Sequence, residues 1–156
     1  MERIEFISKS PYDTWDIGEQ IGKQAKRGDL FIIYGELGSG KTQLVKGIAR
    51  GIGVADWQYV VSPSFTIINI YEGNHSLCHV DLYRLEPHEV IDINVEEFLN
   101  ESVVVVEWAE RGKWWNGAIK IFIDSTGEME RKITMEVEDV SRAEIWRHIS
   151  KKYREN

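Results

Sequence analysis

The sequence contains one cysteine, three prolines and no long hydrophobic run. A single thiol, Cys78, excludes an internal disulfide, and its apolar surroundings in SLCHVDLY predict a buried side chain. No segment approaches the roughly 20 apolar residues of a membrane-spanning helix. The first ten residues, MERIEFISKS, are charged and lack the apolar run of a signal peptide. We therefore expect a cytoplasmic protein that makes no contact with a membrane.

Positive charge is also scarce, since 19 Lys and Arg residues stand against 26 Asp and Glu residues, giving a formal net charge of −7. This excess of negative charge argues against a protein that binds nucleic acid by itself, because such binding depends on cations that neutralise phosphates. It leaves open an RNA that is held by a partner protein. The length of 156 residues and the 42% hydrophobic content suit one folded domain, residues 1–156.

The stretch GELGSGKT at residues 35–42 matches the P-loop pattern G-x-x-x-x-G-K-[ST]. It lies between the apolar run LFIIY and a helical stripe, which is the strand–loop–helix context that the motif requires. Glycines let the backbone turn its N–H groups inward, and the following helix directs its positive end at the same place. We expect Lys41 to bridge the β- and γ-phosphates and Thr42 to bind Mg²⁺. The residues predicted to bind the nucleotide are Gly35, Glu36, Leu37, Gly38, Ser39, Gly40, Lys41, Thr42 and Gln43.

Helical and strand patterns alternate along the rest of the chain. A helix is predicted to begin at Ser10-Pro11, and the helix after the P-loop to end at Gly51 and Gly53. The predicted strands are 30–34, 66–72, 76–83, 102–108, 118–124 and 131–137, followed by a helix from about 140. This pattern predicts an α/β fold: a P-loop NTPase-type three-layer sandwich with a mixed, mainly parallel sheet and a β-hairpin insertion.

Two acidic residues end apolar strands, as the metal-binding acid of a P-loop protein does. Asp81 ends LCHVD and Glu107 ends VVVVE, so both are expected at the carboxyl ends of strands, where ligands bind. The sequence thus offers two candidates for the acid that holds the metal together with Thr42. The alternatives are a turn former for Asp81 and a surface charge at the strand end for Glu107. His79 lies two residues before Asp81, on the same strand face, and either orients Asp81 or packs.

Three classes of protein use such a loop. A GTPase is disfavoured because the guanine-reading motif N/T-K-x-D is absent, and Asp124–Gly127, which fits D-x-x-G, is better explained as a turn. A small-molecule kinase remains open, although the arginines after the P-loop are scattered and form no evident lid. A scaffold that only holds nucleotide would tolerate the loss of one acid, so the presence of both favours hydrolysis.

Four segments together resemble the TsaE (YjeE-type) ATPases over about residues 10–137: GELGSGKT, VSPSF at 61–65, HVDLYRL at 79–85 and VEWAER at 106–111. The resemblance implies a P-loop fold that binds ATP or ADP with Mg²⁺ and hydrolyses ATP slowly alone. It also implies docking on the TsaB–TsaD pair, which transfers a threonylcarbamoyl group to the adenosine 3′ of the anticodon in tRNA. ATP hydrolysis would reset that complex between turnovers, and tRNA would be reached only through it.

The resemblance also implies roles for the site residues: Thr42, Asp81 and Glu107 hold the metal, and Lys41, Asp81 and Glu107 act in catalysis. It implies that Trp108 borders the nucleotide or a partner, with core packing as the alternative. Ser64 replaces a threonine of the family and keeps a hydroxyl for the metal or the γ-phosphate. Gln43 likewise replaces a threonine, one residue past Thr42, where we expect it to sense the base or sugar region of the nucleotide.

Two segments remain ambiguous. The stretch KWWNGAIKI departs from the family, which tends to have Leu-Pro before the next strand. Its Trp114 and Trp115 form either a partner patch or part of the core. Several Lys and Arg residues lie near the end of the sequence. They either form a solvated helix terminus or contact tRNA or TsaD. These cations are Arg142, Arg147, Lys151, Lys152 and Arg154.

Overall fold

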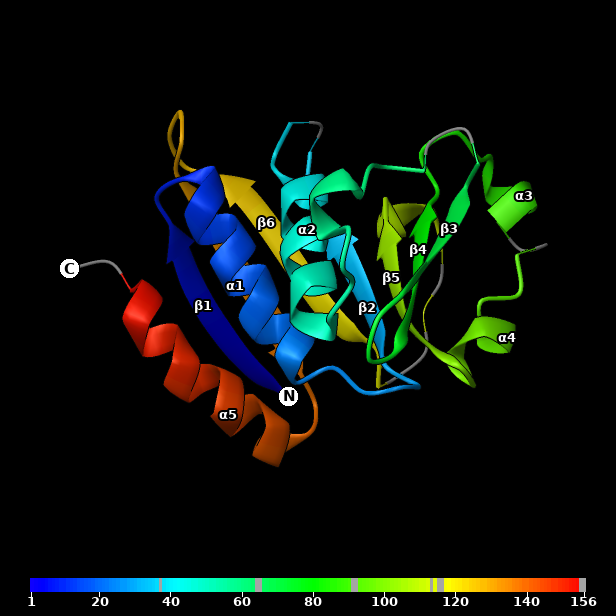
Figure 1. Ribbon diagram of the computed structural model, residues 1–156. Coiled ribbons are helices and arrows are strands. Elements are labelled where there is room, and N and C mark those ends of the chain that lie inside the picture. Colours follow the sequence, from blue (N-terminus) through cyan, green and yellow to red (C-terminus); the bar gives the residue numbers. More distant parts are fainter. Residues whose placement is uncertain (37, 64–65, 91–92, 113, 115–116, 155–156) are drawn as a thin grey trace.

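The computed structural model describes residues 1–36, 38–63, 66–90, 93–112, 114 and 117–154. Within them, one 7-stranded sheet has the order β1-β7-β6-β2-β5-β4-β3 (Figure 1). The central strands β6, β2, β5 and β4 run parallel, and the outer pairs β1–β7, β6–β7 and β3–β4 are antiparallel. The strands are β1 (Glu2–Ser8), β2 (Leu30–Tyr34), β3 (Ile68–Glu72), β4 (Ser76–Asp81), β5 (Ser102–Glu107), β6 (Ile119–Ser125) and β7 (Arg131–Val137). The prediction of a mixed sheet with a parallel centre and a β3–β4 hairpin is confirmed.

Helices cover the two faces of the sheet unequally. The larger hydrophobic cluster joins one face to α1, α2 and α5, and the smaller one joins the other face to short helices and connecting segments. Figure 1 shows α1 and α2 side by side in front of the sheet, with α3 and α4 near the β3–β4 hairpin. The helices are α1 (Pro11–Lys23), α2 (Lys41–Ile52), α3 (Pro87–Val90), α4 (Glu96–Leu99) and α5 (Val140–Ser150), with 3-10 turns η1 (Trp57–Tyr59), η2 (Ala109–Arg111) and η3 (Lys151–Tyr153).

Strand β1 was not predicted from the sequence. Its charged residues alternate with Ile4, Phe6 and Ser8, which are buried, and it pairs antiparallel with β7. This two-residue alternation is the signature of a strand with one buried face. Only the charge of the segment was considered above, and charge at the exposed positions does not prevent strand formation.

The first two helices cross so closely that only glycine fits at the contact. An added Cβ would lie 2.5 Å from Leu44 O at Gly18 and 2.3 Å from Trp15 O at Gly47. Gly51 belongs to the same contact and lies inside α2, so the prediction that it ends the helix was wrong. The prediction for Gly53 is confirmed, because α2 ends at Ile52 and Gly53, with a left-handed φ of 93°, caps it. The crossing fixes α2, and with it the end of the P-loop, against α1.

The single thiol is buried in the smaller cluster, as predicted, and burial raises the pKa of Cys78 to about 11. Among the described residues, no helix combines the length and the apolar character that crossing a membrane requires.

Candidate functional site

The P-loop connects the end of β2, at Tyr34, to the start of α2, at Lys41. At Gly35 an added Cβ would lie 2.6 Å from Ser39 Oγ and 2.8 Å from Ile123 O, so no side chain fits there. Gly38 and Gly40 have φ angles of 79° and 103°, in the left-handed region that favours glycine. The glycines of the motif are therefore required by the shape of the loop.

The side chain of Lys41 is folded back over this loop. Its ammonium group donates hydrogen bonds to Gly35 O and, at 2.9 Å, to Glu36 O, and it lies 4.1 Å from the centre of the Trp108 ring. Burial lowers the pKa of Lys41, against the opposing effect of nearby carboxylates, chiefly that of Glu107. Among the described residues, the hydrogen-bond partners of this buried cation are neutral carbonyls, so Lys41 is well placed to bind an anionic ligand.

Both predicted acids lie at the carboxyl ends of neighbouring parallel strands, where Asp81 pairs with Glu107 in the β4–β5 register. Each side chain is about 2% exposed. Thr42 Oγ1, on the first turn of α2, donates to Glu107 Oε1 over 3.5 Å. Lys41, Thr42 and Glu107 thus lie together at one place in the structure.

His79 is fully buried and contacts Glu107, so of the two expectations for it the orientation of Asp81 was wrong and packing in the interior is confirmed. The imidazole Nε2 lies 2.5 Å from Glu107 Oε2, and both residues are buried. The oxygens of Asp81 have other partners: the Ser62 hydroxyl donates to one, and the N–H of Tyr83 donates to the other at 2.8 Å. The two acids therefore have different surroundings, and Asp81 binds the chain segments on either side of the hairpin.

Trp108 follows Glu107 directly and has a φ of 58°, a left-handed conformation that costs energy in any residue except glycine. Its half-buried ring lies 4.7 Å from the ring of Tyr83 as well as over Lys41. Such strain is typical of functional sites. That Trp108 borders a bound nucleotide stays a prediction.

Gln43 is anchored to the neighbouring helix. Its Oε1 accepts a hydrogen bond of 2.6 Å from Trp15 Nε1, which ties the first turn of α2 to α1. The predicted role of Gln43 at the base or sugar is not tested by this contact. Leu37, Ser64 and Trp115 were also singled out in the sequence, and they lie outside the described residues.

The residues present fit the phosphates of a nucleotide. Ser39 Oγ is buried and has no hydrogen-bond partner among the described residues, while α2 begins beside it without a side-chain cap. A helix N-terminus with unpaired N–H groups favours phosphate. In the described part of the chain, no group of three or more His, Cys, Asp or Glu side chains forms a metal site. Nucleotide-bound Mg²⁺ needs only one or two protein ligands, and Thr42 with Glu107 meets that requirement.

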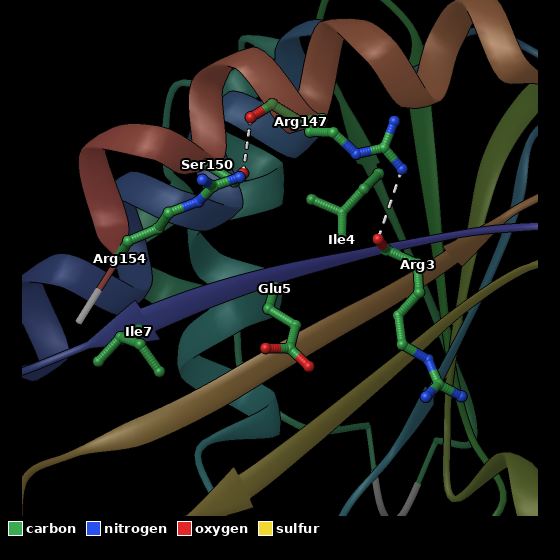
Figure 2. Close-up of a pocket in the computed structure, with 7 residues that line it drawn as sticks. All are labelled: Arg3, Ile4, Glu5, Ile7, Arg147, Ser150 and Arg154. Carbon is green, nitrogen blue, oxygen red and sulfur yellow. Dashed lines mark hydrogen bonds between the residues drawn. The ribbon is translucent and has the colours of Figure 1, made fainter.

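The cations near the end of the chain are partly bound to other residues of the protein. Arg142 binds both carboxylate oxygens of Asp29, at 2.8 and 2.7 Å, and Arg147 binds Glu144 at 2.6 Å and Glu2 at 3.2 Å. A hollow of about 320 Å³ lies between β1 and α5, and Figure 2 shows the side chains that line it. It is lined by Arg3, Ile4, Glu5, Ile7, Arg147, Ser150 and Arg154, and none of these belongs to the P-loop. Two of the five cations thus have structural ion pairs.

Trp114 donates from its Nε1 to Ala109 O at 2.7 Å and packs against the smaller hydrophobic cluster.

Two further residues of the site were not recognised from the sequence. Ser62 lies in the VSPSF segment and binds Asp81, and Arg131 binds the P-loop from 92 positions away. No local pattern reveals either contact, because both depend on which strands become neighbours.

The fold and the site geometry define an α/β protein of the P-loop class. A model of the family described as "Threonylcarbamoyl adenosine biosynthesis protein TsaE" matches residues 8–133. The chain belongs to this TsaE family.

Relatives named tRNA threonylcarbamoyladenosine biosynthesis protein TsaE cover much of the chain. The protein of Aquifex aeolicus is 37% identical over 130 residues, 83% of this chain and 92% of that protein. The protein of Bacillus subtilis is 36% identical over 138 residues, 86% and 85% of the two chains. For the protein of a Nostoc species, 40% identical over 104 residues, the match spans 63% of each chain, which is less than two thirds of that relative's length. A crystal structure of Bacillus subtilis YdiB has a TM-score of 0.72 at 28% identity, covering 97% of this chain and 95% of that one.

Proposed function

We propose that this protein binds ATP or ADP with Mg²⁺ at the P-loop and hydrolyses ATP in support of tRNA threonylcarbamoyladenosine biosynthesis. The proposal rests on the proximity of the half-buried Thr42 to the buried side chains of Lys41 and Glu107. Membership of the TsaE family supplies the pathway. We further propose that the whole chain, residues 1–156, acts as one ATPase domain in the cytoplasm.

In this proposal Lys41 exchanges its two carbonyl partners for phosphate oxygens. Its ammonium group is already buried beside the loop, so the exchange replaces neutral acceptors by charged ones, which bind cations more strongly. Backbone N–H groups at the start of α2 bind the same phosphates. The positions of these donors are fixed before the reaction, which is how electrostatic stabilisation lowers a barrier.

The two acids are assigned different roles. Glu107, which is hydrogen-bonded to Thr42, holds the metal with it and orients the attacking water, while His79 fixes the orientation of the carboxylate. Bound Mg²⁺ neutralises charge on the phosphates. Asp81 positions the segments around the site, because its oxygens accept hydrogen bonds from the Ser62 hydroxyl and from the N–H of Tyr83.

The partners are proposed from the family. We propose that the protein docks on the TsaB–TsaD complex, contacts tRNA only through that complex, and resets it between turnovers by hydrolysing ATP. Slow hydrolysis by the isolated chain follows if a partner completes the site, as arginine fingers do in other P-loop proteins.

The decisive experiment measures phosphate release from ATP by the protein alone and with purified TsaB, TsaD and tRNA. We expect slow release alone and clear stimulation by the complex. Lys41→Ala should abolish productive ATP binding, whereas Lys46→Ala, a matched loss of charge on α2 whose ammonium binds Gln58 O, should leave binding intact. Turnover that appears only when a small acceptor is added would instead identify a small-molecule kinase.

A further inference from the structure

Arg131 reaches the P-loop from the other end of the chain. It is the first residue of β7 and lies opposite Ser125 on β6 and Ser8 on β1. Its Nε donates to Ser39 O at 2.8 Å, and its Nη2 donates to Gly38 O at 3.5 Å. These two carbonyls belong to the part of the loop that precedes Lys41.

The same guanidinium holds the turn between β6 and β7. Its Nη1 donates to Gly127 O at 3.1 Å, Glu128 O at 3.3 Å and Glu130 O at 2.8 Å. One rigid, planar group therefore connects two loops that are separated by about 90 positions in the sequence. All five acceptors are backbone carbonyls, and no ion pair of Arg131 occurs among the described residues. Its positive charge is thus left beside the phosphate-binding loop.

The bond to Ser39 O has a consequence for the following amide. The peptide bonds of the described chain are trans, so the C=O of Ser39 and the N–H of Gly40 point in opposite directions. With the carbonyl of Ser39 bound to Arg131, the N–H of Gly40 points away from Arg131. Gly40 is also the residue before α2 and has no side chain to provide a cap. The hydrogen bond from Arg131 therefore fixes the orientation of this peptide.

We propose that Arg131 is a positioning residue of the P-loop, which holds the Ser39–Gly40 peptide in the orientation that binds phosphate. The inference rests on the proposed function, because it concerns nucleotide affinity at the same site. It assigns Arg131 no contact with the reacting atoms. Loss of the guanidinium should therefore weaken binding and leave the rate at saturation nearly unchanged.

The test compares ADP affinity by titration calorimetry, and ATP turnover, in the wild type, Arg131→Ala and Arg131→Lys. Hydrogen bonds from a charged donor are worth roughly a factor of ten or more in affinity. We expect Kd and KM to rise about tenfold in both variants, with kcat within about twofold, because lysine keeps the charge but lacks the fork that joins the loops. Lys132→Ala is the matched control, since Lys132 is the next residue and its ammonium lies 3.4 Å from Glu5. An unchanged Kd in Arg131→Ala, or full recovery in Arg131→Lys, would overturn the proposal.

A second measurement does not require nucleotide. Amide hydrogen exchange should become faster across residues 35–41 in Arg131→Lys and Arg131→Ala, and stay at the wild-type rate in Lys132→Ala. Equal exchange in all four proteins would also refute the role of Arg131. A wild type that binds no nucleotide would overturn the proposed function, whereas the exchange experiment decides independently whether Arg131 orders the loop. If Arg131→Ala does not fold, Arg131→Lys still decides the question.

Discussion

At the scale of single residues, the contrast between the two buried acids is the most informative feature. Glu107 binds Thr42 and His79, whereas Asp81 binds Ser62 and the backbone of Tyr83. We therefore expect Glu107 to act directly in ATP hydrolysis. Asp81 should affect the reaction by holding Ser62 and Tyr83 in position.

We predict that Glu107→Ala lowers ATP hydrolysis by about 100-fold or more while ADP still binds, because Lys41 and the loop remain. Glu107→Gln keeps a hydrogen-bond acceptor for His79 and should fold as the wild type does, so it separates loss of charge from loss of packing. Phosphate release and calorimetric titration measure the two effects. Turnover at the wild-type rate in both variants would show that Glu107 is not catalytic.

At the scale of secondary-structure elements, the crossing of α1 and α2 controls where the P-loop ends. Gly47→Ala would place a Cβ 2.3 Å from Trp15 O, and a backbone oxygen has little room to move. Overpacking costs about 1–3 kcal/mol, more than the ~1 kcal/mol that alanine gains over glycine in a helix. We predict a net loss of stability, measured by urea unfolding. Gly127→Ala is the control, because its added Cβ would find its nearest neighbour at 3.5 Å, and equal stability of the two variants would contradict the prediction.

The stability that α5 gives to the fold is predicted to depend on pH, because its N-cap residue, Asp139, is a titratable carboxyl. Hydrogen bonds from the Ser141 hydroxyl and the N–H of Arg142 lower the pKa of Asp139 below its ordinary value. A carboxyl with a lowered pKa adds stability above its unfolded pKa of about 4, and this contribution is lost as the pH falls through the folded value. Asp139→Ala should therefore melt at a lower temperature than the wild type at pH 7. The difference in melting temperature should shrink below about pH 4, and a difference independent of pH would count against this account.

At the scale of the whole molecule, the core around α5, which stabilises the fold, is separate from the P-loop site. Trp146 of α5 is fully buried in the larger cluster, with its ring 6.4 Å from that of Phe31, and its Nε1 has no partner among the described residues. No residue of α5 belongs to the P-loop site. We predict that Trp146→Ala lowers the free energy of unfolding by about 3–5 kcal/mol while the folded fraction keeps its affinity for ADP.

Trp146→Phe should cost less, because the ring remains and the unpaired N–H is removed. The exposed neighbour Ile145, about 45% accessible, gives the control Ile145→Ala, which should be nearly neutral. Urea unfolding and calorimetry on the same samples measure both quantities. A loss of ADP affinity in fully folded Trp146→Ala would show that the two regions are coupled.

The sequence predicted well whatever depends on neighbours along the chain. The P-loop between β2 and α2, the β3–β4 hairpin and the buried acids at two strand ends follow from local spacing, and the structure agrees with them. Strand β1 was missed although its alternation is local, because its exposed positions are charged. The interior position of Gly51 could not be predicted, because a glycine at a helix contact has the same local pattern as one at a helix end.

The sequence by itself determined the phosphate-binding loop, because its shape needs only contiguous glycines and a helix that begins at Lys41. Only the tertiary structure decided which side chains support that loop. Thr42 meets Glu107 across 65 positions, His79 meets Glu107 across 28, and Arg131 meets Ser39 across 92. Such contacts depend on strand order, on register and on how a helix lies over the sheet. These are set by the packing of the whole core, and no local pattern in the sequence encodes them.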